Sequence, residues 1–149
     1  TDRDYLEYLR KKAQTHANIK ILEPVDRGDL VNVLAGYDIG LFVPRLVTPN
    51  LEHALPNKLF EFIQARLMII ATKGSDAGDL VIEKKVGEVC DATAKSLARV
   101  LANLTCVKID QYKAAAHKCA STMTSNRYGE DYRLILEERQ KGKVMRRGS

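Results

Sequence analysis

Residues 54–72, ALPNKLFEFIQARLMIIAT, constrain the fold more than any other part of this chain. Pro56 and Asn57 mark the start of a helix within this segment, and Asn is a preferred residue at the N-cap of a helix. Apolar residues then recur at helical spacing and predict a helix over residues 57–66 with one apolar face. Residues 68–71 are a short uncharged run, which is typical of a strand in a parallel sheet covered on both faces. The segment therefore predicts a loop, a helix and a buried strand in that order.

The sequence before this segment alternates between the same two patterns. It predicts a helix over residues 2–17, a strand at 19–22, a helix over 26–35 and a buried strand at 39–43. A long loop with three prolines follows, residues 44–56. Loops of this length inside a domain are usually functional or disordered. Because this loop follows a strand, it is expected at the carboxyl end of the sheet, where open α/β sheets bind ligands.

The sequence after the segment continues the alternation. It predicts a helix over residues 78–85, a strand at 86–89, a helix capped by Ser96, and two further helices over 108–123 and 128–139. Alternating strands and helices imply an α/β fold, with a parallel sheet flanked by helices on both faces. The fold class is therefore a Rossmann-like α/β domain.

The net charge of +5 comes from the end of the chain. Residues 139–149, RQKGKVMRRGS, contain five Lys or Arg and no acidic residue, and the rest of the chain is neutral. A neutral body does not indicate a nucleic-acid partner. We predict a single domain over residues 1–138 and a disordered basic tail over 139–149. Contact of this tail with anionic lipid, worth about 1 kcal/mol per basic residue, is the alternative.

The cysteine, histidine and hydropathy patterns limit which disulfides, metal sites and membrane segments the chain can have. The three cysteines have no CxxC spacing and are interpreted as small core residues in a reducing compartment. The histidines show no metal-ligand spacing, so no metal site is predicted. No apolar run is long enough to span a bilayer, and no signal peptide opens the chain. A cytoplasmic protein is expected, with the inner face of the membrane as a second location. The three cysteines are Cys90, Cys106 and Cys119, and the three histidines are His16, His53 and His117.

The predicted helix at 57–66 also offers a binding chemistry. A helix start presents free N–H groups and a partial positive charge, which suit a phosphate. Glu61 lies four residues after Asn57, so both side chains fall on one face near that start. A plain amphipathic helix with a good cap is the alternative interpretation of the same spacing.

The segment LPNKLFEFIQARLMIIAT, residues 55–72, closely resembles the donor-binding segment of the retaining "group 1" glycosyltransferases with the GT-B fold. AGYDIGLFVP, residues 35–44, resembles the strand before that segment in the family. GSDAGDLVIEKKVGEVCD, residues 74–91, resembles the helix and strand after it. The similarity covers roughly residues 19–105, and its parts occur in the family's order.

The resemblance implies a transferase that moves a sugar from a UDP-sugar or GDP-sugar to a glycan or lipid-linked acceptor. It implies no cofactor beyond this donor substrate. The chain corresponds to the C-terminal, donor-binding domain, and the domain's first two strands, its Gly-rich turn and its Arg/Lys pair are not found before Thr1. The acceptor-binding N-terminal domain is not found either. Catalysis by this chain alone is therefore not expected, and its catalytic residues stay unknown.

The resemblance also assigns roles to residues. Glu61 corresponds to the family glutamate that binds the ribose, and the backbone of Asn57, Lys58 and Leu59 is placed against the diphosphate. The side chains of Lys58 and Arg45 could add positive charge.

A departure from the family pattern occurs before this helix. His53 stands eight positions before Glu61, where many relatives have an acidic residue that contacts the donor sugar, and Glu52 is beside it. Either Glu52 takes that role through a shifted loop, or the subgroup lacks the carboxylate. Pro24 and Val25 match the loop that borders the base in relatives.

Two alternative functions stay open at this stage. One is a sugar-nucleotide epimerase, which shares the GT-B architecture, and the other is a non-catalytic α/β module used for assembly. The family strand order, 3-2-1-4-5-6, places strands one and two between 19–22 and 39–43. Without them, these two segments would pair directly, another copy would pair with the exposed edge, or the chain would belong to a longer one. A self-associating or truncated form is therefore expected in place of a stable monomer.

Overall fold

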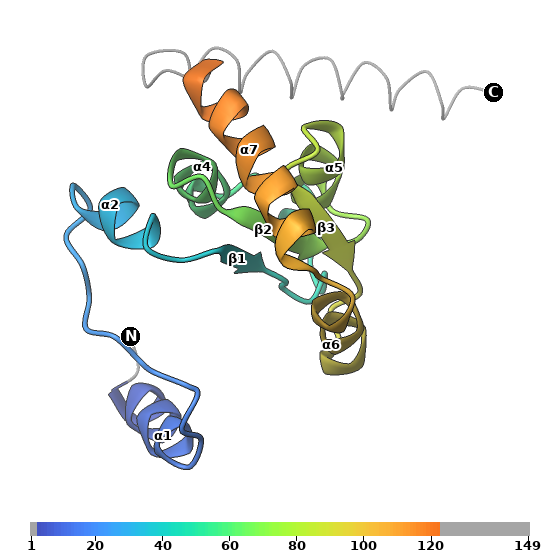
Figure 1. Ribbon diagram of the computed structural model, residues 1–149. Helices are drawn as coiled ribbons and strands as arrows, with labels where there is room; N and C mark the ends of the chain where they lie inside the picture. The colour runs from blue at the N-terminus through green and yellow to red at the C-terminus, as the bar shows by residue number, and fades with distance from the viewer. Residues whose placement is uncertain (1–2, 123–149) are drawn as a thin grey trace.

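The computed structural model describes residues 3–122, and these form an α/β fold with a three-stranded parallel sheet flanked by helices (Figure 1). The elements are α1 (Arg3–Gln14), α2 (Leu30–Leu34), β1 (Ile39–Phe42), α3 (Pro49–Glu52), α4 (Asn57–Gln64), β2 (Met68–Thr72), α5 (Asp76–Glu83), β3 (Gly87–Cys90), α6 (Ala94–Ala102) and α7 (Cys106–Thr122). The predicted helix at 128–139, the domain limit at 138 and the basic tail lie outside the described residues.

The strand β2 is the centre of the sheet. The sheet order is β1-β2-β3, with Ile39 beside Met68 and Ile69 beside Gly87. All five residues of β2 are buried, which confirms the prediction of a buried strand. The connections run through α4 and α5, as a parallel sheet requires.

Two hydrophobic clusters cover the two faces of the sheet. Successive residues of β2 point to opposite faces, so Ile69 and Ala71 belong to one cluster and Met68 and Ile70 to the other. The first cluster receives apolar side chains from α4, α5 and the second half of α7. The second receives them from α6 and the first half of α7. The helix α7 therefore contributes to both faces.

The approach of α4 to β1 requires a glycine. A Cβ atom at Gly40 would lie 2.6 Å from atoms of the Phe62 ring, which is closer than two carbon atoms can approach. Phe62 comes from α4, so a side chain at position 40 would push this helix away from the strand. Glycine is needed here because of this close contact.

Residues 15–29 and α1 form an N-terminal arm that stands apart from the sheet (Figure 1). The predicted strand at 19–22 is wrong, because this segment pairs with no strand within residues 3–122, and Ile19 and Leu22 are about half exposed. A strand needs a neighbour for its backbone hydrogen bonds, and the segment does not lie along β1. An ion pair of 2.8 Å between Arg10 and Glu23 joins residues 15–29 to α1 instead.

The starts of α5 and α6 and the cap of α4 differ from the sequence predictions. Ser75 caps α5 by accepting a hydrogen bond from the N–H of Gly78, so this helix begins at residue 76 and not at 78. Thr93, not Ser96, caps α6. The N-cap of α4 is Pro56, and Asn57 is its first helical residue. Each hydroxyl cap lies one turn before the apolar residues that define the helix face, which is why periodicity alone placed the starts too late.

The cysteines do not share one environment. Cys90 is buried in the second cluster, as predicted, whereas Cys119 is partly buried and Cys106 is exposed. Cys106 is the first residue of α7, where no neighbouring turn covers it. The prediction of a core position is therefore wrong for Cys106.

Candidate functional site

The candidate site is the carboxyl edge of the sheet, where the loops after β1, β2 and β3 meet. The opposite, amino edge is in contact with α7. There, Asp38, which precedes β1, accepts a hydrogen bond of 2.7 Å from Lys113, and Arg66, which precedes β2, donates one of 3.0 Å to Nδ1 of His117. Because α7 contacts the amino edge, the candidate site is the carboxyl edge, where α/β sheets bind ligands.

The loop between β1 and α4, residues 43–56, is anchored to the rest of the edge. The hydroxyl of Thr72, at the end of β2, donates a hydrogen bond of 2.8 Å to the carbonyl of Pro44. Thr48 caps the short helix α3 within the loop, and Leu55 is buried in the first cluster. The loop predicted to be functional or disordered is therefore an ordered segment with a helix of its own.

The start of α4 presents the residues that the resemblance assigns to a nucleotide. Asn57 and Lys58 are exposed, and Glu61 is partly buried one turn further along the helix. Within residues 3–122, the side chains of Lys58 and Glu61 have no hydrogen-bond or ion-pair partner. As far as the described residues are concerned, the ammonium of Lys58 and the carboxylate of Glu61 are thus both available to bind a ligand.

Leu59 behaves differently from the two residues before it. Its side chain is fully buried in the first cluster, and its N–H donates a hydrogen bond of 3.0 Å to the carbonyl of Pro56. Within the described residues, the N–H groups of Asn57 and Lys58 donate to no backbone carbonyl. The free donors expected at a helix start are therefore those of Asn57 and Lys58.

His53 connects the loop after β1 to the helix after β2. It is the C-cap of α3, and its Nδ1 lies 3.5 Å from Oδ2 of Asp76, the first residue of α5. The Asp76 side chain is 10% exposed and that of His53 is 46% exposed. Glu52, at the end of α3, is exposed. The His53 imidazole therefore faces a carboxylate that is almost fully buried.

The sequence predictions did not include Asp76, Ser75 or Thr72 among the site residues. A usable signal was present, because Ser75 followed by Asp76 is the pattern of an N-cap with an acid in the first turn. Placing the helix start at residue 78 concealed that pattern.

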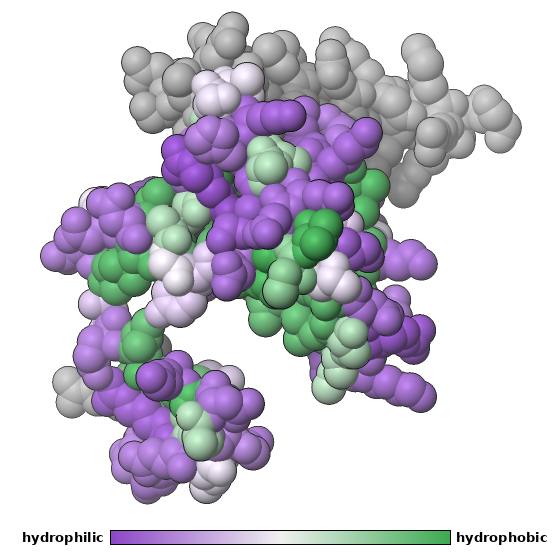
Figure 2. All heavy atoms as spheres, in the orientation of Figure 1, coloured by the Kyte–Doolittle hydropathy of each residue, from purple (hydrophilic) through white to green (hydrophobic). Residues whose placement is uncertain are grey.

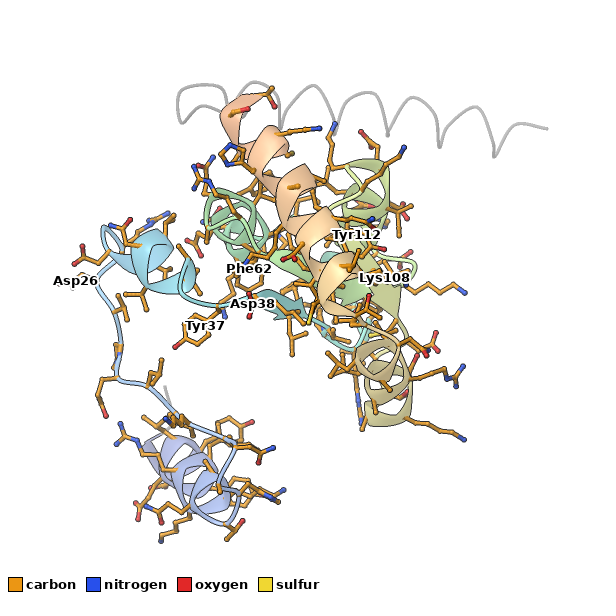
Figure 3. All side chains as sticks on the ribbon, viewed as in Figure 1. Asp26, Tyr37, Asp38, Phe62, Lys108 and Tyr112 are labelled. Atoms are coloured by element: carbon orange, nitrogen blue, oxygen red, sulfur yellow. The ribbon has the colours of Figure 1, made fainter. Side chains whose placement is uncertain are left out.

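The other predicted site residues lie in two other segments of the chain. Arg45 is exposed in the loop after β1, where its carbonyl accepts a hydrogen bond of 2.9 Å from Val47. Pro24 and Val25 lie in the exposed N-terminal arm. The next residue, Asp26, lies beyond α2, on the side from which β1 begins (Figure 3). The proposed contacts of these three residues therefore stay predictions.

The pKa shifts with the clearest cause lie between β3 and α7. Glu88 accepts hydrogen bonds from the Tyr112 hydroxyl at 2.7 Å and from the Lys108 ammonium at 3.1 Å. The hydrogen bond from Tyr112 holds the pKa of Glu88 below its usual value. Burial, together with the hydrogen bond to Glu88, raises the pKa of Tyr112 to about 12. Glu88, Lys108 and Tyr112 thus join α7 to β3, and none of them lies in the loops of the carboxyl edge.

The pKa values of two cysteine thiols are also shifted. Burial raises the pKa of Cys90 and that of Cys119. Because the thiolate is the reactive form, both thiols are less nucleophilic than an exposed cysteine at neutral pH. Neither side chain is therefore a candidate nucleophile.

Among residues 3–122, no three His, Cys, Asp or Glu side chains lie close enough to hold a metal ion together. No helix in this part of the chain is both long and apolar enough to cross a membrane. The sequence and structure match no protein-family model, no curated protein and no solved structure.

Proposed function

We propose that this chain is the donor-binding part of a glycosyltransferase that uses a nucleoside diphosphate sugar, UDP-linked or GDP-linked, and transfers the sugar to a glycan or lipid-linked acceptor. The observation that carries the proposal is the start of α4. Two exposed residues with free N–H groups, Asn57 and Lys58, are followed one turn later by the partly buried carboxylate of Glu61, which has no partner within residues 3–122.

This arrangement suits a nucleotide for physical reasons. The diphosphate oxygens accept hydrogen bonds from backbone N–H groups, and the partial positive charge of the helix start favours the anion. The ammonium of Lys58 adds a charge-assisted contact. The two ribose hydroxyls donate to a carboxylate, and Glu61 supplies one at the distance of a helical turn from the phosphate contacts.

Titration calorimetry with UDP and with GDP tests the proposal. Wild type is compared with Glu61→Gln, which keeps the shape of the side chain but removes its charge. The loss of a charged hydrogen bond costs about 1–3 kcal/mol, or roughly 5-fold to 150-fold in affinity. Glu7→Gln is the matched control, because Glu7 is an exposed helical carboxylate on α1, and we expect it to leave the affinity unchanged.

Two results would oppose the proposal. Equal affinity of Glu61→Gln and wild type for the nucleotide would remove Glu61 from the site. Absence of nucleotide binding by wild type, at millimolar concentrations of both nucleotides, would favour the alternative of a non-catalytic assembly module. An epimerase would bind the same nucleotides, and it would differ by interconverting the bound sugar without an acceptor.

A further inference from the structure

His53 differs from the other described histidines in what its ring faces. His16 is exposed in the N-terminal arm, and His117 is exposed on α7, whose outer surface is mainly hydrophilic in the space-filling view (Figure 2). Nδ1 of His117 accepts a hydrogen bond from Arg66, whereas Nδ1 of His53 lies 3.5 Å from Oδ2 of Asp76. The ring of His117 is therefore turned to a donor and the ring of His53 to an acceptor.

The backbone segments that carry His53 and Asp76 are both fixed. The N–H of His53 donates to the carbonyl of Pro49 at 2.9 Å, and Leu55, two residues later, is buried. Asp76 follows Ser75, whose hydroxyl caps α5, and the Asp76 side chain is 10% exposed. The contact between the two side chains therefore follows from the fold of these segments, and it does not depend on ordering two long surface side chains.

The contact determines which ring nitrogen of His53 carries a proton. Carboxylate oxygens only accept hydrogen bonds, so a bare Nδ1 that faces Asp76 would place two acceptors against each other. A negative charge is favourable at position 76, because this residue lies in the first turn of α5. Nδ1 therefore carries a proton, and in the neutral ring the lone pair lies on Nε2. Since the His53 side chain is 46% exposed, the pair presents a hydrogen-bond acceptor at the carboxyl edge.

The proposed function, on which this inference rests, gives the bound donor a direction. Its ribose contacts Glu61 and its diphosphate contacts the N–H groups of Asn57 and Lys58, so the sugar lies toward the residues that precede the helix. The three residues at positions 54–56 have no polar side chain. His53 is thus the first polar side chain before α4, and its Cα atom lies at most about 14 Å from that of Asn57. A diphosphate with one sugar attached can span such a distance.

We propose that Asp76 is a positioning residue for His53, and that Nε2 of His53 accepts a hydrogen bond from a hydroxyl group of the donor sugar. Sugar hydroxyls are donors, and a neutral imidazole accepts with the nitrogen that carries no proton. A carboxylate at position 53 would accept from such a hydroxyl in the same way. The pair thus replaces a direct carboxylate contact with a contact through an imidazole, and Glu52, the other candidate for this contact, is not required.

Titration calorimetry on the full chain tests the contact with the sugar. The probes are UDP-glucose, UDP-galactose, UDP-N-acetylglucosamine and GDP-mannose, each compared with its free nucleotide. His53→Phe keeps a ring but removes the acceptor, so at least one nucleotide sugar should lose about 2-fold to 12-fold in affinity, as for one hydrogen bond. The affinity for UDP and GDP should stay unchanged. His53→Gln, which has an amide oxygen near the position of Nε2, should retain more of the affinity than His53→Phe.

Long-range proton–nitrogen NMR spectra at pH 8, where an imidazole is ordinarily neutral, show which ring nitrogen of His53 carries the hydrogen. We expect the hydrogen on Nδ1 in wild type. Asp76→Asn keeps the shape of the side chain and should move the hydrogen toward Nε2, since an amide in place of such a carboxylate favours the other tautomer. It should also weaken binding of the same nucleotide sugar as His53→Phe does. Asp79→Asn, which removes the other first-turn carboxylate of α5, is the control and should change neither measurement.

A hydrogen on Nε2 in wild type would overturn the proposal, because Nε2 could not then accept. An equal loss for nucleotide and nucleotide sugar in His53→Phe, or no loss for any of the four nucleotide sugars, would overturn it too. A selective loss in Glu52→Gln but not in His53→Phe would assign the sugar contact to Glu52 instead. In each of these cases, nucleotide binding that weakens in Glu61→Gln would still support the proposed function. Absence of nucleotide binding by wild type would oppose both proposals.

Discussion

Two short apolar runs of this chain, IKIL at residues 19–22 and MIIA at residues 68–71, have different structures. The second lies in the fully buried β2, whereas the first is an exposed segment of the N-terminal arm. The runs have the same length and each contains two isoleucines, but the first includes Lys20 and the second has no charged residue. The difference lies in their neighbours, because β2 has a strand on each side and a hydrophobic cluster on each face. A run of four apolar residues thus becomes a strand only where other elements satisfy its backbone and cover its side chains.

The largest expected difference between the two runs is the cost of removing an isoleucine side chain. Ile70 is fully buried and Ile19 is 51% exposed. Ile70→Ala should lower the free energy of unfolding by about 2–5 kcal/mol, since it leaves a cavity in the core. Ile19→Ala should change it by less than about 0.5 kcal/mol. Urea unfolding followed by circular dichroism measures both, and similar costs would mean that residues 19–22 are packed in solution.

A smaller difference is expected for two glycines. Gly40→Ala forces a Cβ atom into the Phe62 ring, and such overpacking costs about 1–3 kcal/mol. Gly28, in the N-terminal arm, has nothing within 4 Å of the position of a Cβ atom. Gly28→Ala should therefore be neutral or stabilise the chain slightly by restricting the unfolded state. The thermal midpoints of the two variants test this contrast, and a neutral Gly40→Ala would show that α4 can move away from β1.

The smallest difference concerns two polar contacts, one in each region. Tyr112→Phe removes the hydrogen bond to Glu88 between α7 and β3, and we expect a loss of about 1 kcal/mol, at the lower end for a bond to a charged group because the pair is only partly buried. Glu23→Gln removes the exposed ion pair with Arg10, which should cost less than about 0.5 kcal/mol. Chemical unfolding at pH 7 compares them, and equal losses would contradict the contrast.

The Tyr112 contact also has a pH signature with a definite sign. The pKa of Glu88 is lower in the folded state than its usual value of 4.5, so its stabilisation is present above that pH and is lost as the pH falls below it. The pKa of Tyr112 rises from 10.0 to about 12, so its stabilisation is present below pH 10 and is lost between pH 10 and about 12. In Tyr112→Phe, stability should vary less with pH at both ends. An unchanged profile would show that other groups cause the pH dependence.

Local signals predicted the middle of the fold well. The start of α4 at Asn57 and the buried β2 follow from a turn, a helical period and an uncharged run that lie next to each other in sequence. The positions of Lys58 and Glu61 at the carboxyl edge follow from the same signals. The α3 helix was not predicted, although Thr48 and Pro49 form a cap and a first-turn proline, because four residues give no period to detect.

Other features depend on contacts that no local pattern contains. The strand prediction for residues 19–22 failed because the sequence does not show whether a partner strand is available. The contact of His53 with Asp76 joins the end of α3 to the start of α5. Because α4 and β2 separate these positions in the sequence, only the three-dimensional structure brings them together. The position of α7 at the amino edge is of the same kind, since Lys113 and Asp38 are far apart in the chain.

The order of strands in the sheet has a consequence for how the chain is synthesised. Because β1, β2 and β3 are neighbours in space in the order in which they leave the ribosome, each new strand can dock on the previous one without waiting for a later segment. The exception is α7, whose Ala116 and Ala120 complete the cluster that contains Leu59 and Ile63. Until this helix has emerged, at about 5–20 residues per second, part of the apolar surface of α4 faces water. Burial of the apolar face of α4 is therefore completed only when the last described helix docks.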